Sequence, residues 1–180
     1  KEVCIGSSHF LFDDEGVAYP EGARERIYAL APTSSIIYMA EDGKLVGAIC
    51  ISDPLREEAA SVISQLRTLG VKRFVMLTGD SENVAANVAQ QLGIDEYVSR
   101  VLPEDKRSYV EKYRAEGYTV AMVGDGINDS PALAASDVSL AMSDASDIAR
   151  AVADISIRNT SLESLVIIRL LSQRVMQRIH

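Results

Sequence analysis

Hydrophobic positions in the middle of the chain alternate between short apolar runs and longer segments in which apolar residues recur every three or four positions. Short runs rich in β-branched residues predict buried strands, and the longer spacing predicts amphipathic helices. Single helices between successive strands favour parallel pairing, so the pattern predicts an α/β fold with a Rossmann-like parallel sheet and helices on both faces. The expected strands are residues 44–52, 73–77, 97–101, 118–123, 138–142 and 154–157.

Turn residues mark the expected helix ends in this region. Asp53 suits the cap of the first helix, and Pro54 suits its first turn. Proline has no backbone N–H, but an N–H in the first turn would have no hydrogen-bond acceptor within the helix. Gly70, Gly93 and Gly117 each follow an apolar helical segment, as expected of residues that end a helix in the left-handed conformation.

The two ends of the chain depart from this alternation. Residues 1–43 contain one helical stretch and one strand pattern, and we interpret them as part of a smaller α+β unit. The last twenty residues read as a single helix with a basic polar side. We therefore expect three regions: a small unit over 1–50, the α/β unit over 51–160 and a basic helix over 161–180.

Composition and charge exclude several classes of protein. The chain has 180 residues, 47% of them hydrophobic, and a net charge of −8, which excludes a disordered tail and a general nucleic-acid binder. Cys4 and Cys50 lack the CxxC spacing of thiolate sites, so we expect neither a disulfide scaffold nor a thiolate metal cluster. No apolar run reaches the ~18 residues of a membrane span. Positive charge gathers in residues 158–180, which hold four arginines and one glutamate.

Polar residues follow the predicted strands at the end where parallel sheets bind ligands. Thr78 and Gly79 come directly after one strand and offer a hydroxyl and backbone N–H groups to an anion. Asp125 comes directly after another strand, with Asn128 and Asp129 a few residues on. We expect these residues to converge on one site.

Lys106 is the expected cation of this site. It shares a helical stripe with Val110 and Tyr113, so it faces the core rather than solvent. Side chains lean toward the helix N-terminus, which directs the ammonium group to the same edge of the sheet. Lysine balances the charge of a transferring phosphoryl group, and Mg²⁺ takes one or two carboxylates beside phosphate oxygens. Together these residues predict a phosphate-plus-magnesium site.

Each motif also has an ordinary structural interpretation when taken alone. A Thr-Gly-Asp turn is common between a strand and a helix, and a single lysine usually lies in solvent. Gly-Asp-Gly at 124–126 resembles the opening of a dinucleotide fingerprint, but the third glycine is missing and Asp125 would repel a pyrophosphate. Their combination in this order favours the phosphate site.

Three motifs resemble the phosphorylation domain of P-type ATPases, which belong to the haloacid dehalogenase superfamily. They are Thr-Gly-Asp at 78–80, Leu-Pro-Glu-Asp-Lys at 102–106 and Met-Val-Gly-Asp-Gly-Ile-Asn-Asp-Ser-Pro-Ala-Leu at 122–133. The last motif, with Leu-Ala-Met at 140–142, is most similar to the heavy-metal-translocating subfamily. Asp-Pro-Leu-Arg at 53–56 resembles the junction between the nucleotide-binding and phosphorylation domains. Residues 3–6 and 35–51 look like the latter half of the nucleotide-binding domain.

The resemblance implies a role for each site residue, with ATP and Mg²⁺ as cofactors. Asp80 would support the turn that carries the phosphate-binding hydroxyl. The implied site residues are Thr78, Gly79, Lys106, Asn128 and Asp129 around the phosphoryl group, Asp125 and Asp129 at Mg²⁺, and Gly6 near the adenine.

The resemblance also implies that the parent protein is an ATP-driven pump for a heavy-metal cation, in which an aspartate accepts the γ-phosphoryl group. That aspartate lies in an Asp-Lys-Thr-Gly-Thr motif, which this chain lacks. Because the chain begins at Lys1 and its first methionine is Met39, we expect a soluble, carboxyl-side piece of the cytoplasmic region of a membrane protein. Its expected partners are ATP, the transported cation (through the parent's membrane helices) and the rest of the same ATPase.

The missing motif predicts a defect in the sheet. In the superfamily the strand that bears the aspartate is central, and without it two neighbouring strands would present unpaired backbone groups, which are costly when buried. We hypothesise that another polypeptide, a rearranged segment or a second copy fills this place. We also expect that the chain alone does not phosphorylate itself.

Two other functions stay open from the sequence. A soluble phosphatase of the same superfamily also carries a Gly-Asp-x-x-Asn-Asp motif, but it needs an amino-terminal Asp-x-Asp nucleophile. Asp13 and Asp14 lack the apolar strand that would precede such a nucleophile. The second alternative is a non-catalytic module that keeps a Mg²⁺-phosphate pocket.

Overall fold

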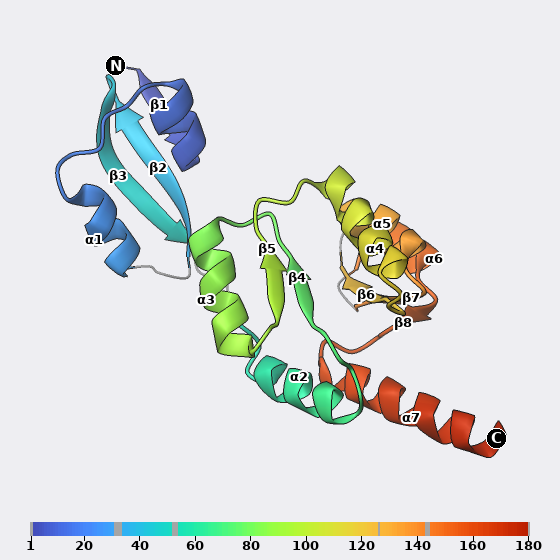
Figure 1. The fold of residues 1–180 in the computed structure, drawn as a ribbon. Coiled ribbons are helices and arrows are strands. Elements are labelled where there is room, and N and C mark those ends of the chain that lie inside the picture. Colours follow the sequence, from blue (N-terminus) through green and yellow to red (C-terminus); the bar gives the residue numbers. More distant parts are fainter. Residues whose placement is uncertain (1, 31–33, 52–53, 126, 143–144, 180) are drawn as a thin grey trace.

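The computed structural model describes residues 2–30, 34–51, 54–125, 127–142 and 145–179. It consists of a small antiparallel unit followed by an α/β unit with parallel strands, which confirms the predicted fold class (Figure 1). The strands are β1 (Val3–Gly6), β2 (Ser35–Glu41), β3 (Lys44–Ile51), β4 (Val75–Leu77), β5 (Glu96–Val98), β6 (Ala121–Gly124), β7 (Val138–Ala141) and β8 (Ile155–Ser156). The helices are α1 (Ala23–Leu30), α2 (Ala59–Thr68), α3 (Glu82–Leu92), α4 (Lys106–Ala115), α5 (Ser130–Ala135), α6 (Asp147–Val152) and α7 (Glu163–Ile179). The other helical segments are a π-helix, η1 (His9–Asp14), and two 3₁₀ turns, η2 (Pro103–Asp105) and η3 (Ile127–Asp129).

The small unit is a three-stranded antiparallel sheet in the order β1-β2-β3. Asp42 and Gly43 connect β2 to β3 with positive φ angles of 47° and 75°, the conformation that tight hairpin turns require. One face of the sheet packs on η1 through a core of Leu11, Val17 and Tyr38.

The other face of this small sheet is apolar and uncovered in the structure. It presents aliphatic side chains that are each at least half exposed, where a folded domain normally buries such residues. They are Val3, Ile5, Val46, Ile49 and Ile51.

The parallel strands of the α/β unit form two separate sheets. β4 pairs with β5, and β6 pairs with β7, which pairs with β8. Among the described residues no ladder joins β4 to β6, and Figure 1 shows the two groups of strands apart. Val123 in β6 is 39% exposed, although central strands of parallel sheets are normally buried on both faces. The division of the sheet agrees with the hypothesis that a central strand is missing.

Helices, rather than strand pairing, join the two groups of parallel strands. α4 follows β5 in the chain but packs on α5 beside β6, and η2 contacts η3. Tyr113 ties α4 back to β5, because its hydroxyl donates a hydrogen bond of 2.7 Å to Glu96. α2 and α7 form a second helix pair, in which Arg169 and Gln173 donate to the carbonyl of Leu69 at the end of α2.

Several predicted boundaries are wrong, and tertiary contacts explain the largest difference. The helix predicted from Pro54 begins only at Ala59, and Asp53 lies outside the described residues. Residues 54–58 instead meet the segment before α7, where Arg56 donates to the carbonyl of Thr160 and Glu58 accepts from the N–H of Leu162. These partners are more than one hundred positions away and leave no local signal.

α7 confirms the predicted C-terminal helix, but its apolar side is mostly uncovered. Val166 is buried, whereas Leu171, Val175 and Ile179 are each more than half exposed. None of the helices in the described ranges is long and apolar enough to cross a bilayer.

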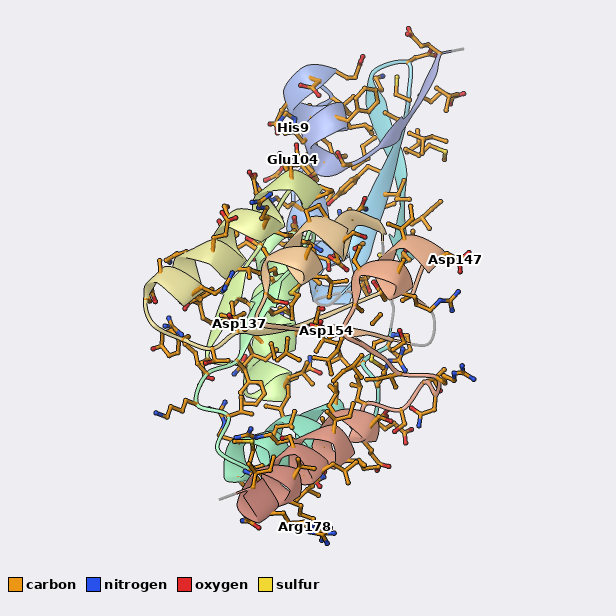
Figure 2. The ribbon with its side chains drawn as sticks, turned by 90° about the vertical axis from the view of Figure 1, so that its right-hand side faces the viewer. His9, Glu104, Asp137, Asp147, Asp154 and Arg178 are labelled. Atoms are coloured by element: carbon orange, nitrogen blue, oxygen red, sulfur yellow. The ribbon has the colours of Figure 1, made fainter. Side chains whose placement is uncertain are left out.

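Acidic side chains at the amino ends of the strands accept hydrogen bonds from neighbouring strands, which is a structural role. Asp137 and Asp154 lie at the end of the β6-β7-β8 sheet opposite Glu104, as Figure 2 shows. Asp137 accepts from the N–H of Val120, and Asp154 accepts from both the N–H and the hydroxyl of Ser139. The two Ser139 hydrogen bonds lower the pKa of Asp154.

Asp95, just before β5, likewise accepts a backbone hydrogen bond from the residue before the neighbouring strand β4. Its low pKa gives a testable dependence of stability on pH. Arg67 donates two hydrogen bonds to its carboxylate, and the N–H of Phe74 donates a third of 2.7 Å. Arg67, followed by Phe74, holds the pKa of Asp95 below 3.8. Its stabilising contribution is therefore complete above the unfolded-state pKa near 3.8 and is lost as the pH falls through the lower folded-state pKa.

We expect Asp95→Asn to lower the free energy of unfolding by about 1 kcal/mol at pH 7, a small value because the ion pair is one-third exposed. The difference from the unsubstituted chain should shrink as the pH falls below 3.8. Urea unfolding between pH 7 and pH 3 measures it. Asp147→Asn, at a carboxylate that is 95% exposed, is the control and should change stability little. A difference that grows on acidification would contradict this account.

Candidate phosphate and magnesium site

Lys106 and Asp129 form a largely buried ion pair at the carboxyl end of β6. Lys106 is the first residue of α4, and its Nζ lies 2.7 Å from Oδ1 of Asp129. The side chains are 17% and 10% exposed, respectively. Val110 and Tyr113 are buried on the same helix, which confirms that Lys106 lies on the inward stripe predicted from the sequence.

Asp125 and Asn128 lie beside this pair on the loop that follows β6. The N–H of Asp125 points to Oδ2 of Asp129 at 3.4 Å, and its carbonyl accepts from the N–H of Ser146 at the start of α6. Asp125 and Asn128 are both exposed, so their side chains remain accessible to a ligand. Gly126 of the same motif lies outside the described residues.

Gly124 allows Asp129 to approach the strand. A Cβ atom at this position would lie 2.8 Å from Cβ and 3.0 Å from Oδ2 of Asp129. Real Cβ atoms do not approach other atoms this closely, so only glycine fits here. The glycine of this motif therefore serves the placement of Asp129.

Thr78, Gly79 and Asp80 form a second group of polar residues at the carboxyl end of β4. The Thr78 hydroxyl donates to Oδ2 of Asp80 at 2.7 Å and accepts from the Asp80 N–H at 3.1 Å. The carbonyl of Thr78 accepts from the N–H of Val101, so the loop is tied to the segment after β5. Thr78 is half-buried, whereas Gly79 and Asp80 are exposed.

The structure thus groups the predicted residues in three places. Lys106, Asp129 and the Asp125 loop are in contact with one another. Thr78 and Gly79 lie on the other half of the divided sheet, also at carboxyl strand ends. Gly6 lies in β1 of the small unit, where a Cβ would lie 2.6 Å from the ring of Phe10. Figure 1 shows β1 at the far end of the molecule from β4 and β6.

The donor set beside Lys106 fits Mg²⁺ with a phosphate. Asp125 and Asp129 could supply the one or two carboxylates that Mg²⁺ uses, with phosphate and water in its other positions. Oγ of Ser130, the residue after Asp129, is buried and has no hydrogen-bond partner among the described residues. No group of three His, Cys, Asp or Glu side chains suited to a metal occurs within those residues.

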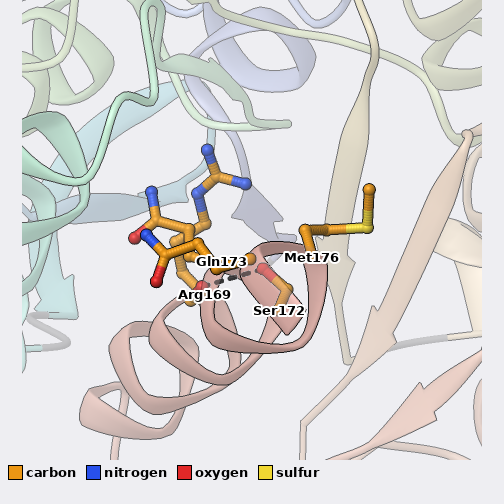
Figure 3. Close-up of a pocket in the computed structure, with 5 residues that line it drawn as sticks. Arg169, Ser172, Gln173 and Met176 are labelled. Atoms are coloured by element: carbon orange, nitrogen blue, oxygen red, sulfur yellow. Dashed lines mark hydrogen bonds between the residues drawn. The ribbon is translucent and has the colours of Figure 1, made fainter. Parts of the chain in front are cut away.

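A shallow cavity of about 330 Å³ lies elsewhere, along α7. Figure 3 shows Arg169, Ser172, Gln173 and Met176 around it, with the Ser172 hydroxyl donating to the carbonyl of Arg169. No carboxylate lines this cavity, so it does not contribute to the candidate site.

Comparison with known proteins agrees with the geometry. The model of the haloacid dehalogenase-like hydrolases matches residues 3–137, three-quarters of the chain. The chain belongs to this family. P-type ATPases are among its relatives. The chain is 44% identical over 176 residues to a zinc-exporting P-type ATPase of Mycobacterium marinum, covering 97% of the chain and 24% of that protein. It is 47% identical over 146 residues to a manganese-exporting P-type ATPase of Mycobacterium leprae, covering 81% of the chain and 20% of that protein.

A solved structure of a zinc-transporting PIB-type ATPase in an E2·Pi state is 33% identical to this haloacid dehalogenase-like chain, with a TM-score of 0.75. The match covers 98% of the chain and 28% of that structure. The resemblance to heavy-metal P-type ATPases is therefore confirmed. The chain spans between a fifth and a quarter of the length of these two ATPase relatives.

Two features of this family member's site could not be found from the sequence. The hydroxyl of Ser35, on β2 of the small unit, donates to Oδ1 of Asp80 at 3.2 Å. The second feature is the unpartnered hydroxyl of Ser130. Ser35 is 45 positions away from Asp80, and Ser130 lies inside the motif at 122–133 without any local sign that its hydroxyl is buried and unpartnered.

Proposed function

We propose that this chain is the part of a heavy-metal cation-transporting P-type ATPase that supplies the phosphate clamp and the Mg²⁺ site for phosphoryl transfer from ATP to an aspartate outside the chain. The Lys106–Asp129 pair beside the accessible Asp125 carboxylate carries this proposal. A buried ammonium group at the carboxyl edge of parallel strands is an unusual and costly feature for a purely structural element.

The roles of the residues follow from their positions. Lys106 donates hydrogen bonds to phosphoryl oxygens and balances their charge, while Asp129 fixes its ammonium group. Asp125 and Asp129 hold Mg²⁺, and Asn128 offers its amide to a phosphate oxygen. When bound, Mg²⁺ supplies charge neutralisation and orients the phosphate. Thr78 and the Gly79 N–H bind the phosphoryl group from the other half of the sheet.

The missing central strand is the partner that this site needs. A strand between β4 and β6 would pair with both free edges and make one parallel sheet. Its carboxyl end would then lie between Thr78 on one side and Lys106 and Asp125 on the other. We propose that this strand belongs to the preceding part of the same ATPase and bears the Asp-Lys-Thr-Gly-Thr aspartate.

The domain boundaries follow the same proposal. Residues 1–50 form part of a nucleotide-binding domain, with Gly6 near the adenine, and the rest of that domain would cover the apolar face of the small sheet. Residues 51–160 are the phosphorylation domain without its aspartyl strand. Residues 161–180 lead toward a membrane span on the cytoplasmic side, where arginines are favoured. The transported cation binds in membrane helices of the parent.

Labelling with [γ-³²P]ATP and Mg²⁺ tests this function. We expect the chain alone to stay unlabelled, because it lacks the acceptor aspartate. Mixing it with the upstream cytoplasmic segment of a relative, containing the Asp-Lys-Thr-Gly-Thr strand, should give an acid-stable, hydroxylamine-sensitive label on the added segment. Lys106→Met in the chain should reduce that label by at least tenfold.

One control and two further outcomes separate the proposal from its alternatives. The added segment with its acceptor aspartate changed to asparagine should take up no label. A stoichiometric label on the chain alone would overturn the proposal. Hydrolysis of p-nitrophenyl phosphate by the chain alone would instead favour the soluble phosphatase.

A further inference from the structure

A hydrogen bond links the small unit to the phosphate-binding loop. Ser35 is the first residue of β2, and its hydroxyl donates to Oδ1 of Asp80 at 3.2 Å. Asp80 lies two residues after Thr78 on the loop that follows β4. The contact therefore joins the part of the chain assigned to nucleotide binding with the loop assigned to phosphate binding.

The Asp80 side of this contact is held in place by the α/β unit. The carbonyl of Asp80 accepts from the N–H of Arg100, and the carbonyl of Thr78 accepts from the N–H of Val101, both at 2.9 Å. The N–H of Thr78 donates to the carbonyl of Val98. Arg100 has a φ of 52°, in the left-handed region, so the segment after β5 turns sharply to make these contacts. Ser35 thus bonds to an acceptor whose backbone is fixed.

The second carboxylate oxygen of Asp80 is hydrogen-bonded to Thr78, the residue that we propose binds the phosphoryl group. Oδ2 accepts from the Thr78 hydroxyl at 2.7 Å, while Oδ1 accepts from Ser35. A hydroxyl has a single proton to donate, so Thr78 cannot donate to Asp80 and to an oxyanion at the same time. When Thr78 turns to an oxyanion, the Asp80 carboxylate loses the hydrogen bond from Thr78 and keeps the one from Ser35.

We propose that Ser35 is a positioning residue, which holds the Asp80 carboxylate, controls the direction of the Thr78 hydroxyl, and keeps the small unit against the phosphate-binding loop. The part that concerns Thr78 rests on the proposed function, because it takes Thr78 as a ligand of the phosphoryl group. The link between the two units rests on the Ser35–Asp80 geometry alone.

Ser35→Ala removes the donor, and Ser35→Thr keeps it. Spin labels at the exposed Cys50 of β3 and at Lys72→Cys in the α/β unit, in a Cys4→Ser background, report the distance between the two units by pulsed electron paramagnetic resonance. We expect a broader distance distribution with Ser35→Ala and an unchanged one with Ser35→Thr. The same distribution in all three chains would overturn the proposal.

Titration with inorganic phosphate and Mg²⁺, followed through the amide shifts of Thr78 and Asp80, tests the second part. Ser35→Ala should weaken phosphate binding about fivefold, the factor that corresponds to one ordinary hydrogen bond, and Ser35→Thr should restore it. Unchanged affinity in Ser35→Ala would overturn the role of Ser35 at Thr78. Absence of phosphate binding to the unsubstituted chain would contradict the proposed function, while the distance measurement would still decide the link between the units.

Discussion

Replacing Lys106 by alanine is expected to lower the free energy of unfolding by about 3 kcal/mol. The substitution leaves the Asp129 carboxylate, whose side chain is 10% exposed, without the ammonium group 2.7 Å away. A buried charge that loses its partner keeps its desolvation cost and loses the attraction that offset it. Lys106→Met should lower the free energy of unfolding by nearly as much, because it also removes the charge that pairs with Asp129. It keeps the aliphatic part of the side chain, so packing is little changed. Urea unfolding at pH 7 measures both variants.

Arg107→Ala is the matched control for this prediction. Arg107 is the next residue of α4 and also forms an ion pair, with Glu111, but its side chain is 61% exposed and that of Glu111 is 51% exposed. Solvent screens such a pair, so we expect a loss of only about 0.3–0.5 kcal/mol. Equal losses at positions 106 and 107 would show that the Lys106–Asp129 pair is not effectively buried.

The inward position of Lys106 was predictable because it depends on helical periodicity. Residues 106, 110 and 113 lie on one stripe of α4, and Val110 and Tyr113 are buried as that stripe requires. The end of α3 at Gly93, which adopts a left-handed φ of 66°, follows from an equally local signal. Alternating strand and helix patterns likewise predicted the parallel pairing.

Features that depend on distant partners were not predictable. β5 stops at Val98 instead of continuing to Val101, because Arg100 turns to donate its N–H to Asp80. η1 forms in a segment that reads as an acidic loop, since Leu11 is fully buried under the small sheet. The Ser35–Asp80 contact depends in the same way on how two units meet. Each of these features is set by tertiary contacts that override local preference.

The structure brings together only part of the site that the sequence predicts. One half, formed by Lys106, Asp129 and the Asp125 loop, is assembled within the chain by the contact of η2 with η3 and of α4 with α5. Thr78 lies on the other half-sheet, and the described residues supply no strand to pair β4 with β6. The sequence motifs predict residues that would meet around a strand, but pairing across the sheet requires that strand to be present.

Gly124→Ala is expected to destabilise the chain by about 2 kcal/mol and to displace Asp129. The added Cβ would lie 2.8 Å from Cβ of Asp129, and Asp129 cannot retreat freely because Lys106 holds its other carboxylate oxygen. Because the nearest atom is a Cβ that alanine also possesses, Asp129→Ala in the same chain should not rescue the loss.

Gly79→Ala is the control at the equivalent turn after β4, where the nearest atom to an added Cβ is the carbonyl oxygen of Val101 at 3.8 Å. We expect the free energy of unfolding of that variant to lie within about 0.5 kcal/mol of that of the unsubstituted chain. Similar losses for the two glycines would mean that backbone freedom, rather than the approach of Asp129, explains the glycine after β6.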